Sequence, residues 1–540
     1  MILINSAAYV NDDLRAEFGL LPPCFLPLGN RRLYHHQIES LRKAFPEEKI
    51  YLSLPEEYHI GRYDQQYFNE NDITILKTSY TLSQGHSLYR LLNDFNLIEC
   101  DKLIINYGDT FYHTFEATSD DYFYVSNNIG YYNRASVVIN GDKLIINKDN
   151  PAVDNGELVI SGFFCFSNIG RLCECLKKMN YDFLSSSELY YSSVATKVLK
   201  NDHWYDFGHL NSFFTSRTSI TTEREFNSLQ INNFCVIKKS KKKAKMLGEA
   251  NWFLSLPPAL SIFTPRVFDV REDNDYAEYT IEYLYNLPLS DMAVFCELPK
   301  SCWVNVFNSC RDFLNRSKEY SNSKKTLDMS ELASYDKLYY DKTLKRLHDF
   351  ELTTNIQLTK DVIFNGKRFP SIKKIAEISS RFINPTKSDD VIITHGDFCF
   401  SNILYDLRSQ RIKLIDPRGI NYNNELSIWG DIRYDLAKLC HSVIGCYDLI
   451  IAQKFLLEYD YVDNRIEFEL YDDNYSDIVN SFLGVFNSFE EFGYTIEEIQ
   501  CITIHLFLSM LPLHSDSKLR QEAFIANAYR LFSLLNLEYL

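Results

Sequence analysis

The chain has 540 residues, more than one hydrophobic core normally holds, so two or three domains are expected. Hydrophobic residues make up 46% and charged residues 24%, a balance that excludes wholesale disorder. Asp and Glu outnumber Lys and Arg by 72 to 56, and the net charge of −16 argues against nucleic acid as a partner.

The cysteines and the N-terminal segment bear on the cellular compartment. The 13 Cys follow no CxxC or metal-ligand spacing, which is typical of reduced thiols in the cytoplasm. The first residues, MILINSAAYVNDDLR, lack the basic and apolar regions of a signal peptide, and no run approaches 18 uninterrupted apolar residues. We expect a cytoplasmic protein with no membrane partner, and we leave its oligomeric state open.

The first half of the chain alternates short apolar runs with helical patterns. Strands are predicted over residues 1–4, 49–52, 73–76 and 103–106, with helices over 31–45 and 83–94 between them. This alternation predicts an α/β fold with a mostly parallel, doubly wound sheet.

Antiparallel pairing is predicted next, in residues 122–147. Strands over 137–139 and 143–146 would flank an Asn140-Gly141 turn, and residues 158–166 would return a strand to the sheet.

A polar, Ser/Thr-rich segment at 212–226 divides the chain. A small lobe is predicted after it, with strands over 228–232, 234–238, 266–270 and 277–283 and a helix over 243–256 that Pro257 and Pro258 end. The pattern then becomes helical, with one helix over 335–346 and strands over 391–394 and 412–414. We predict three parts, residues 1–218, 219–289 and 290–540.

Four segments of the first half carry chemical information. They are LLPPCFLPLGNRRLYHHQIESL (20–41), LIINYGDTFYH (103–113), SGFFCFSN (161–168) and HWYDFGHLNSF (203–213). In this order they resemble the sugar-nucleotide pyrophosphorylase and phosphocholine cytidylyltransferase superfamily. The resemblance implies that Asp109 and Asp206 bind Mg²⁺, which neutralises the charge that develops when an anionic phosphate attacks a nucleoside triphosphate.

Two departures from that superfamily concern phosphate binding. Its Gly-rich loop would fall at residues 6–15, which read SAAYVNDDLR, and its Pro-Lys pair is Pro22-Pro23 here. Arg15, Arg31 or Arg32 would have to replace the missing cation, although a solvated loop arginine is the simpler interpretation of each. The alternative to a transferase is therefore a binding domain that has lost its catalytic activity.

The stretch 391–419 carries the strongest motif. His395-Gly396-Asp397 follows an apolar strand, Asn402 comes five positions after Asp397, and a second apolar strand ends at Asp416. Phosphoryl transfer needs a carboxylate to orient the attacking hydroxyl and oxygen ligands to hold Mg²⁺ on the nucleotide. The stretch resembles the aminoglycoside phosphotransferase and choline kinase family, which implies that Asp397 is the catalytic base, that His395 braces the loop, and that Asn402 and Asp416 bind Mg²⁺.

Two further segments extend this resemblance. GDIRYDLA (430–437) matches a family segment in which Asp435 has a structural role. Upstream, Cys235-Val236-Ile237-Lys238 ends a predicted strand in Lys, and Glu249 lies on the next helix, so the resemblance implies that Lys238 contacts the ATP phosphates and is held by Glu249. Strand register decides between Lys238 and Lys239, and the loop at 227–233 lacks the glycines with which the family covers the phosphates.

The two resemblances together imply a nucleotidyltransferase-like α/β domain followed by a two-lobed, kinase-like α+β domain. We expect an enzyme that phosphorylates a small alcohol, amino alcohol or sugar with ATP and then transfers a nucleotidyl group from a second NTP, CTP being favoured. Bacterial phosphocholine and capsular-sugar pathways pair such domains, which implies synthesis of cell-surface glycan precursors.

Alternatives to this expectation remain. The first half could be a non-catalytic binding domain attached to a kinase, and a pseudokinase scaffold is opposed by the intact Asp397, Asn402 and Asp416. An aromatic cage for choline could involve Trp429, Tyr434, Tyr339 and Tyr340, but core packing explains such aromatics equally well.

Overall fold

The computed structural model describes residues 1–116, 121–127, 132–140, 143–148, 158–220, 227–320, 329–354, 356–472 and 475–535. The chain forms two compact units, Met1–Ile220 with Phe295–Glu297, and Thr221–Val294 with Leu298–Leu540. Of the predicted Asn140-Gly141 turn, Gly141 lies outside the described residues, as do residues 221–226 of the predicted boundary.

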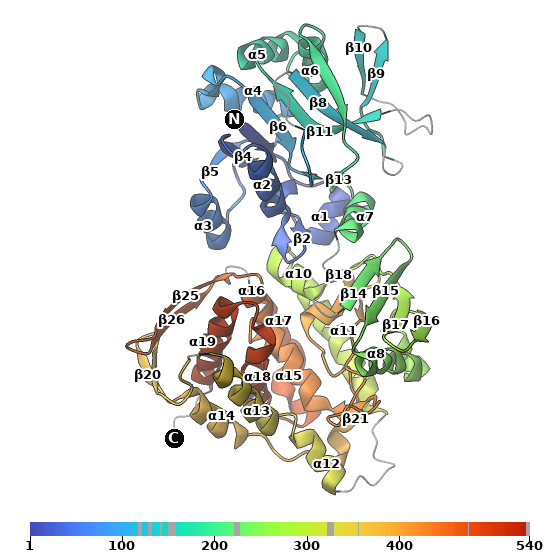
Figure 1. Cartoon of the computed structure of the whole chain (residues 1–540), viewed down its shortest axis with the longest axis vertical. Helices are drawn as coiled ribbons and strands as arrows, with labels where there is room; N and C mark the ends of the chain where they lie inside the picture. The colour runs from blue at the N-terminus through green and yellow to red at the C-terminus, as the bar shows by residue number, and fades with distance from the viewer. Residues whose placement is uncertain are drawn as a thin grey trace. The chain divides into compact units, whose positions relative to one another are not determined.

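The first unit is built on a mixed nine-stranded sheet in the order β10-β9-β11-β6-β1-β4-β5, with β8 pairing β11 and β12 (Figure 1). Four neighbouring strands run parallel, β1 (Ile2–Asn5), β4 (Ile50–Pro55), β5 (Ile73–Thr78) and β6 (Leu103–Tyr107), and β12 pairs in parallel with β8. Its other strands are β8 (Asp121–Asn127), β9 (Ser136–Asn140), β10 (Lys143–Asn147), β11 (Leu158–Phe166) and β12 (Thr196–Lys200). The predicted parallel core is present, and β11 runs antiparallel to β6.

Seven α-helices accompany this sheet in the described part of the unit. They are α1 (Asp12–Phe18), α2 (Leu33–Ala44), α3 (Arg62–Glu70), α4 (Gln84–Asp94), α5 (Ile169–Lys178), α6 (Phe183–Tyr191) and α7 (Leu210–Ser219). The helix predicted from residue 31 begins at Leu33, because Arg31 and Arg32 form β3 (Arg31–Arg32), which pairs with β2 (Pro27–Leu28).

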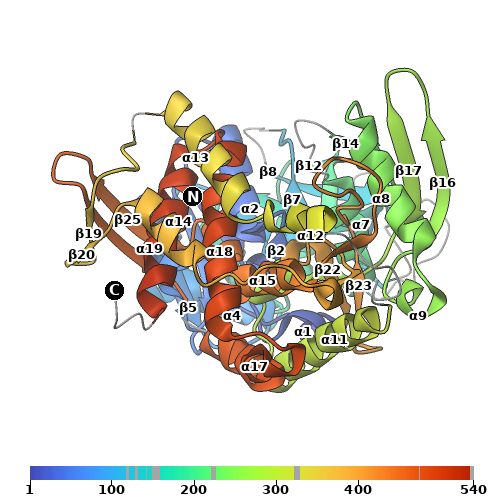
Figure 2. The same ribbon diagram turned by 90° about the horizontal axis from the view of Figure 1, so that it is seen from below.

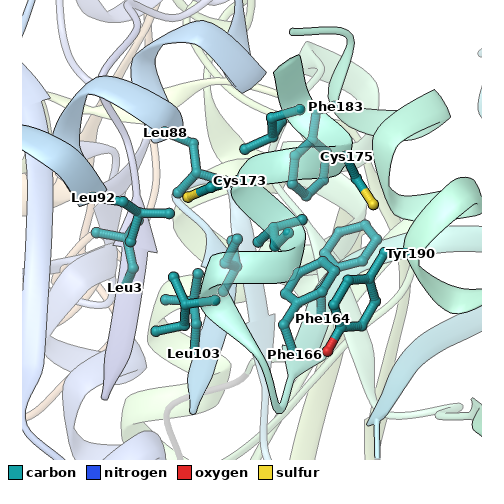
Figure 3. Packing of buried hydrophobic residues seen from close by; sticks show 14 of the residues in the cluster. Leu3, Leu88, Leu92, Leu103, Phe164, Phe166, Cys173, Cys175, Phe183 and Tyr190 are labelled. Atoms are coloured by element: carbon teal, nitrogen blue, oxygen red, sulfur yellow. The ribbon is translucent and has the colours of Figure 1, made fainter. Parts of the chain in front are cut away.

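A hydrophobic core lies where α4, α5 and α6 cover β1, β6 and β11 (Figure 3). Leu3 and Leu103 contribute from the sheet, Leu88 from α4 and Phe183 from α6, and each is at most 4% exposed. Burying a side chain of this size stabilises the fold by about 2 kcal/mol. This core fixes β6, and Asp109 lies two residues after the end of that strand.

The second unit begins with an antiparallel sheet in the order β14-β15-β17-β16. Its elements are β14 (Asn227–Ile231), β15 (Cys235–Ser240), α8 (Lys243–Ser255), α9 (Pro258–Ser261), β16 (Val267–Glu272) and β17 (Ala277–Glu282). Helix α8 packs against β17, and Figure 2 shows it beside the long β16–β17 hairpin.

A helical lobe follows, with α18 packed against α13, α14, α15 and α19. Its helices are α10 (Leu289–Phe295), α11 (Lys300–Lys318), α12 (Met329–Asp336), α13 (Tyr340–Thr353), α14 (Ile372–Ser380), α15 (Ile432–Val443), α16 (Tyr447–Ile451), α17 (Ser476–Phe486), α18 (Ile496–Met510) and α19 (Lys518–Leu534). Among the described residues one helical stretch, Ile496–His514, is apolar and long enough to cross a membrane, and 78% of its apolar window is buried within the protein. Such burial is expected of a core helix.

Three small sheets complete the lobe. Two of them frame the predicted catalytic loop and contain β18 (Leu287–Pro288), β22 (Ile403–Asp406) and β23 (Arg411–Leu414), and β21 (Val391–Ile393) and β24 (Trp429–Asp431). The third was not predicted and contains β19 (Val362–Phe364), β20 (Lys367–Phe369), β25 (Phe455–Asp460) and β26 (Arg465–Leu470).

The predicted helix over 335–346 is wrong. Helix α12 ends at Asp336 and α13 begins at Tyr340, because Tyr339 leaves the helical region with φ −97° and ψ −99°. The buried Tyr339 hydroxyl donates a hydrogen bond to Asp431, 2.7 Å away. This long-range contact holds the break between the two helices.

Candidate functional site

The His395-Gly396-Asp397 loop follows β21 and is fixed by Asp435 at the start of α15. The two carboxylate oxygens of Asp435 accept hydrogen bonds from the backbone N–H groups of His395 and Gly396, each at 2.7 Å. Burial raises the pKa of Asp435 to about 7, although these hydrogen bonds oppose the rise. Asp435 therefore acts on the backbone of the loop.

The His395 side chain links the loop to the segment before Asp416. Its Nε2 lies 3.0 Å from the carbonyl oxygen of Ile415, and its Nδ1 lies 3.3 Å from the Asp397 backbone nitrogen. Burial lowers the pKa of His395 to about 4, so the ring is neutral at neutral pH and can donate from Nε2 and accept at Nδ1. These contacts match a bracing role.

Asp397 is held in its ionised form. The Lys438 ammonium lies 2.8 Å from Oδ1, and the Asn402 amide donates to Oδ2 at 2.9 Å. Enclosure by the loop raises the pKa of Asp397, but the Lys438 charge outweighs this effect and holds the pKa well below its usual range. The Asp397 side chain remains 40% exposed and is therefore open to solvent.

Lys238 lies on the inner face of the small sheet and connects both lobes. Its ammonium lies 2.6 Å from Glu249 on α8 and 3.0 Å from Asp416, which follows β23. Tyr279 on β17 also donates to Glu249 at 2.7 Å. The neighbouring Lys239 instead lies 3.7 Å from Glu278, with its side chain 38% exposed. Register thus directs Lys238, not Lys239, towards Asp416.

The oxygen donors Asn402 and Asp416 come from adjoining segments. The Ile415 backbone N–H donates to the Asn402 carbonyl at 3.0 Å, which holds the two segments side by side. Carboxylate and amide oxygens are the ligands that Mg²⁺ accepts, usually with water and nucleotide phosphates completing its coordination. The donor set therefore fits the predicted ion.

Two glycines allow α8 to approach this segment closely. A Cβ atom on Gly419, whose φ is +61°, would lie 2.0 Å from the Gly248 carbonyl oxygen, and one on Gly248 would lie 2.7 Å from the Ile420 side chain. Glu249 follows Gly248 directly, so this backbone contact sets the position from which Glu249 reaches Lys238.

The predicted metal pair of the first unit lies on a two-stranded sheet of β7 (Thr110–Tyr112) and β13 (Trp204–Asp206). Asp109 precedes β7 and Asp206 ends β13, and a Cβ on Gly208 would meet Asp109 Oδ2 at 2.6 Å and Asp206 Oδ1 at 3.3 Å. Burial, together with the charge of Asp206, raises the pKa of Asp109 to about 6. The two carboxylates thus face a common space at the end of β6.

Arg134 was not predicted and contacts this pair. Its guanidinium lies 2.5 Å from Asp206 Oδ2 and 5.0 Å from the centroid of the Trp204 ring. It lies before β9 in a segment without a motif, so only the folded sheet brings it to Asp206. Lys438 also escaped prediction, although it lies three residues after Asp435 and hence on the same side of a helix.

The arginines considered for phosphate binding occupy different environments. Arg32 is buried and lies 3.2 Å from Asp64, and it also donates to the Phe25 carbonyl at 2.9 Å. Arg31 pairs with Glu39 at 2.6 Å, and Arg15 is exposed on α1. Arg32 is therefore a structural residue and does not replace the missing cation.

Comparison with known proteins finds structural matches to both predicted families. A nucleoside-diphosphate-sugar pyrophosphorylase from Vibrio cholerae RC9 matches over 40% of this chain and 99% of its own, with 15% identity and a TM-score of 0.34. An inositol-1-phosphate CTP transferase from T. maritima matches over 39% of this chain and 90% of its own, with 16% identity and a TM-score of 0.31.

The aminoglycoside phosphotransferase APH(4)-Ia, in a thermostable variant bound to AMP-PNP and hygromycin B, matches over 58% of this chain and 92% of its own. The identity is 12% and the TM-score 0.35. No protein-family model matches the sequence, and a search of curated proteins finds no match.

Proposed function

We propose that the second unit is a kinase that phosphorylates a small hydroxyl-bearing metabolite with Mg-ATP. The observation that carries the proposal is the joining of Lys238, Glu249 and Asp416 in one charged cluster, beside a loop that presents an ionised Asp397. A purely structural role would explain the buried cluster of Lys238, Glu249 and Asp416. It would not explain why Lys438 and Asn402 fix the partly exposed carboxylate of Asp397.

The roles follow from these contacts. Asp397 orients the acceptor hydroxyl, whose oxygen attacks the γ-phosphorus as its proton passes to Asp397. An O–P bond to the acceptor forms, and the bond from the γ-phosphorus to ADP breaks. Lys238 neutralises phosphate charge while Glu249 holds it in place. Asn402 and Asp416 would hold Mg²⁺, which supplies charge neutralisation on the phosphates.

We further propose that the first unit transfers a nucleotidyl group, from CTP in preference to other NTPs, to the phosphorylated product. The support is the pairing of Asp109 with Asp206 against Gly208, a donor set suited to Mg²⁺. A pathway to cell-surface glycan precursors would use such a product. The second candidate is a non-catalytic binding domain, favoured by the Arg134 contact with Asp206 and by the absence of the Gly-rich loop.

A product screen by mass spectrometry tests the kinase. The whole protein receives Mg²⁺, ATP, all four NTPs and pooled alcohols, amino alcohols and sugars. We expect a phosphorylated compound and its nucleoside-diphosphate derivative from the native protein. Asp397→Asn should lower phosphorylation at least about 1,000-fold, as expected when an essential positioning base is removed.

The matched control is Asp406→Asn on β22, outside the catalytic loop. Phosphorylation retained by Asp397→Asn with an unchanged fold would contradict the assignment of the base. A phosphorylated compound without a nucleotidyl derivative would favour the second candidate for the first unit.

A further inference from the structure

A hollow lies next to the catalytic loop, on the side of His395 and Gly396. Beyond these two residues it is lined by Arg418, Tyr422, Trp429 and Tyr434, among others. Through His395 and Gly396 the loop that bears Asp397 forms one wall, so a group bound in the hollow would lie beside that loop.

Cationic side chains surround Tyr434 at this hollow. The Lys342 ammonium lies 3.1 Å from the Tyr434 hydroxyl and 5.4 Å from the ring centroid. The Arg418 guanidinium lies 5.9 Å from the same centroid. Gly396 makes room for Arg418, since a Cβ on Gly396 would lie 2.6 Å from Arg418 Cβ.

The carboxylates near the hollow are already paired. Asp397 contacts Lys438, and Asp431 contacts Arg433 at 2.6 Å. Among the residues that the structure describes, neither Arg418 nor Lys342 has a carboxylate within 4.0 Å. Arg418 in the lining and Lys342 beside the lining residue Tyr434 therefore bring positive charge to the hollow, in a chain whose net charge is −16.

This charge disfavours a cationic acceptor. In an aromatic cage, the Tyr434 ring would contact the quaternary ammonium group of the acceptor. Here the Lys342 ammonium and the Arg418 guanidinium already lie near this ring. Burial would raise the pKa of Tyr434, but Lys342, Lys438 and Arg418 lower it to about 8. An anionic acceptor next to the ATP phosphates needs local cations to offset repulsion, whereas a neutral one does not.

We propose that the acceptor bears an anionic group, a carboxylate or a phosphate, in addition to its hydroxyl. Arg418 and Lys342 are the specificity-determining residues that bind this group. The inference rests on the proposed kinase function and narrows its substrate class to hydroxy acids, sugar acids and hydroxyl-bearing phosphate monoesters.

The first experiment compares acceptors that differ in charge. The whole protein with Mg²⁺ and γ-¹⁸O-labelled ATP receives glycerate or glycerol, gluconate or glucitol, glycerol 3-phosphate, and choline. It also receives a nucleotide-depleted bacterial metabolite extract split by anion exchange into retained and unretained fractions. We expect labelled phosphate only in anionic compounds and in the retained fraction, and the carboxylate and phosphate arms identify the anionic group.

The second experiment measures acceptor KM in variants. Arg418→Gln and Lys342→Met should each raise the acceptor KM about 10- to 100-fold, because each variant loses one charge-assisted hydrogen bond to the acceptor. The KM for ATP should stay unchanged within about twofold. Arg411→Gln on β23 and Lys345→Met on α13 remove exposed cations of the same types and should change neither constant.

The outcomes separate the two proposals. Transfer to neutral or cationic acceptors, or an unchanged acceptor KM in both variants, overturns the anionic acceptor and leaves the kinase standing. Transfer in neither fraction of the extract nor to any defined acceptor counts against the kinase itself, and the inference falls with it.

Discussion

At the scale of single residues, neighbouring charges outweigh burial in setting the ionisation of Asp397 and Tyr434. Lys438 serves two groups, since it pairs with Asp397 and helps to lower the pKa of Tyr434. Asp397 is therefore ionised, as a carboxylate, throughout the neutral pH range. Tyr434, with a pKa of about 8, changes charge just above neutral pH, and the buried Asp435, with a pKa of about 7, titrates at a lower pH.

The pH dependence of acceptor binding follows from Tyr434. Its pKa is about 8, so it is neutral below pH 8 and becomes a phenolate above it. Lys342 on α13, Lys438 on α15, Arg418 and the Tyr339 ring, 6.4 Å away, are the groups that face it. The phenolate offsets one cation, so the KM for an anionic acceptor should rise several-fold from pH 7 to pH 9.

Tyr434→Phe supplies the comparison, because it keeps the ring and removes the titrating hydroxyl. Its KM should stay level across the same interval, with kcat/KM for ATP serving as a control. An equal rise in the variant would mean that another group titrates.

At the scale of elements, a hydrogen bond links α8 to Thr394, the residue that follows β21. The buried Trp252 donates from Nε1 to the Thr394 carbonyl oxygen at 2.7 Å, and its ring lies 5.4 Å from that of His395. The helix that carries Glu249 therefore also contacts the residue preceding His395.

Trp252→Phe should destabilise the second unit by about 2–4 kcal/mol, because it leaves a buried carbonyl unpaired and opens a cavity. Urea unfolding measures this change, and kcat for phosphorylation should fall with it. Leu254→Ala on the same helix, at a side chain 65% exposed, should change stability by no more than about 0.5 kcal/mol. Equal effects of the two substitutions would show that the Trp252 contact is unimportant.

The strands show which parts of the fold could be predicted from sequence patterns and which could not. Parallel strands β1, β4 and β6 were predictable because their apolar runs are buried along nearly their whole length, whereas β5 at the end of the sheet is only partly buried. The β20-β19-β26-β25 sheet was missed, although Arg-Ile-Glu-Phe-Glu-Leu of β26 alternates in the strand pattern. Apart from strands over 391–394 and 412–414, the lobe was predicted to be helical. The buried positions of β26 alternate as expected.

The site residues also fall into two groups, those that the sequence predicted and those that it did not. Lys238, Asp397 and Asp416 stand in ordered motifs, so their association could be predicted. Arg134 reaches Asp206 only through packing of elements distant in sequence, and no local pattern indicates that contact. Lys438 had a local signal, its position three residues after Asp435 on α15, but its partner Asp397 lies in the loop after β21. The break at Tyr339 likewise depends on a hydrogen bond across 92 residues.

At the scale of the whole molecule, each candidate site draws its residues from one unit. Asp109, Arg134 and Asp206 belong to the first, whereas Lys238, Asp397 and Asp416 belong to the second. Substitution in one site should therefore leave the chemistry of the other intact.

Asp109→Ala tests this independence. We expect nucleotidyl transfer to fall below detection, since one of two predicted metal ligands is lost, while the kcat and KM of phosphorylation stay within about twofold. Product analysis with ATP and CTP measures both activities, and Asp101→Ala provides a surface control. Survival of both activities would mean that the nucleotidyl site lies elsewhere.

The distribution of thiols has a consequence for handling the protein. None of the 13 cysteines is in a disulfide bond, and each is buried or half-buried. Cys399 stands two residues from Asp397, yet burial raises its pKa to about 12, which keeps it a poor nucleophile. Alkylating reagents therefore gain rapid access to the buried thiols, Cys399 among them, only as the fold opens. The chain thus carries its own set of reporters of unfolding in both units, and loss of activity on alkylation would register opening of the fold and not chemistry at the base.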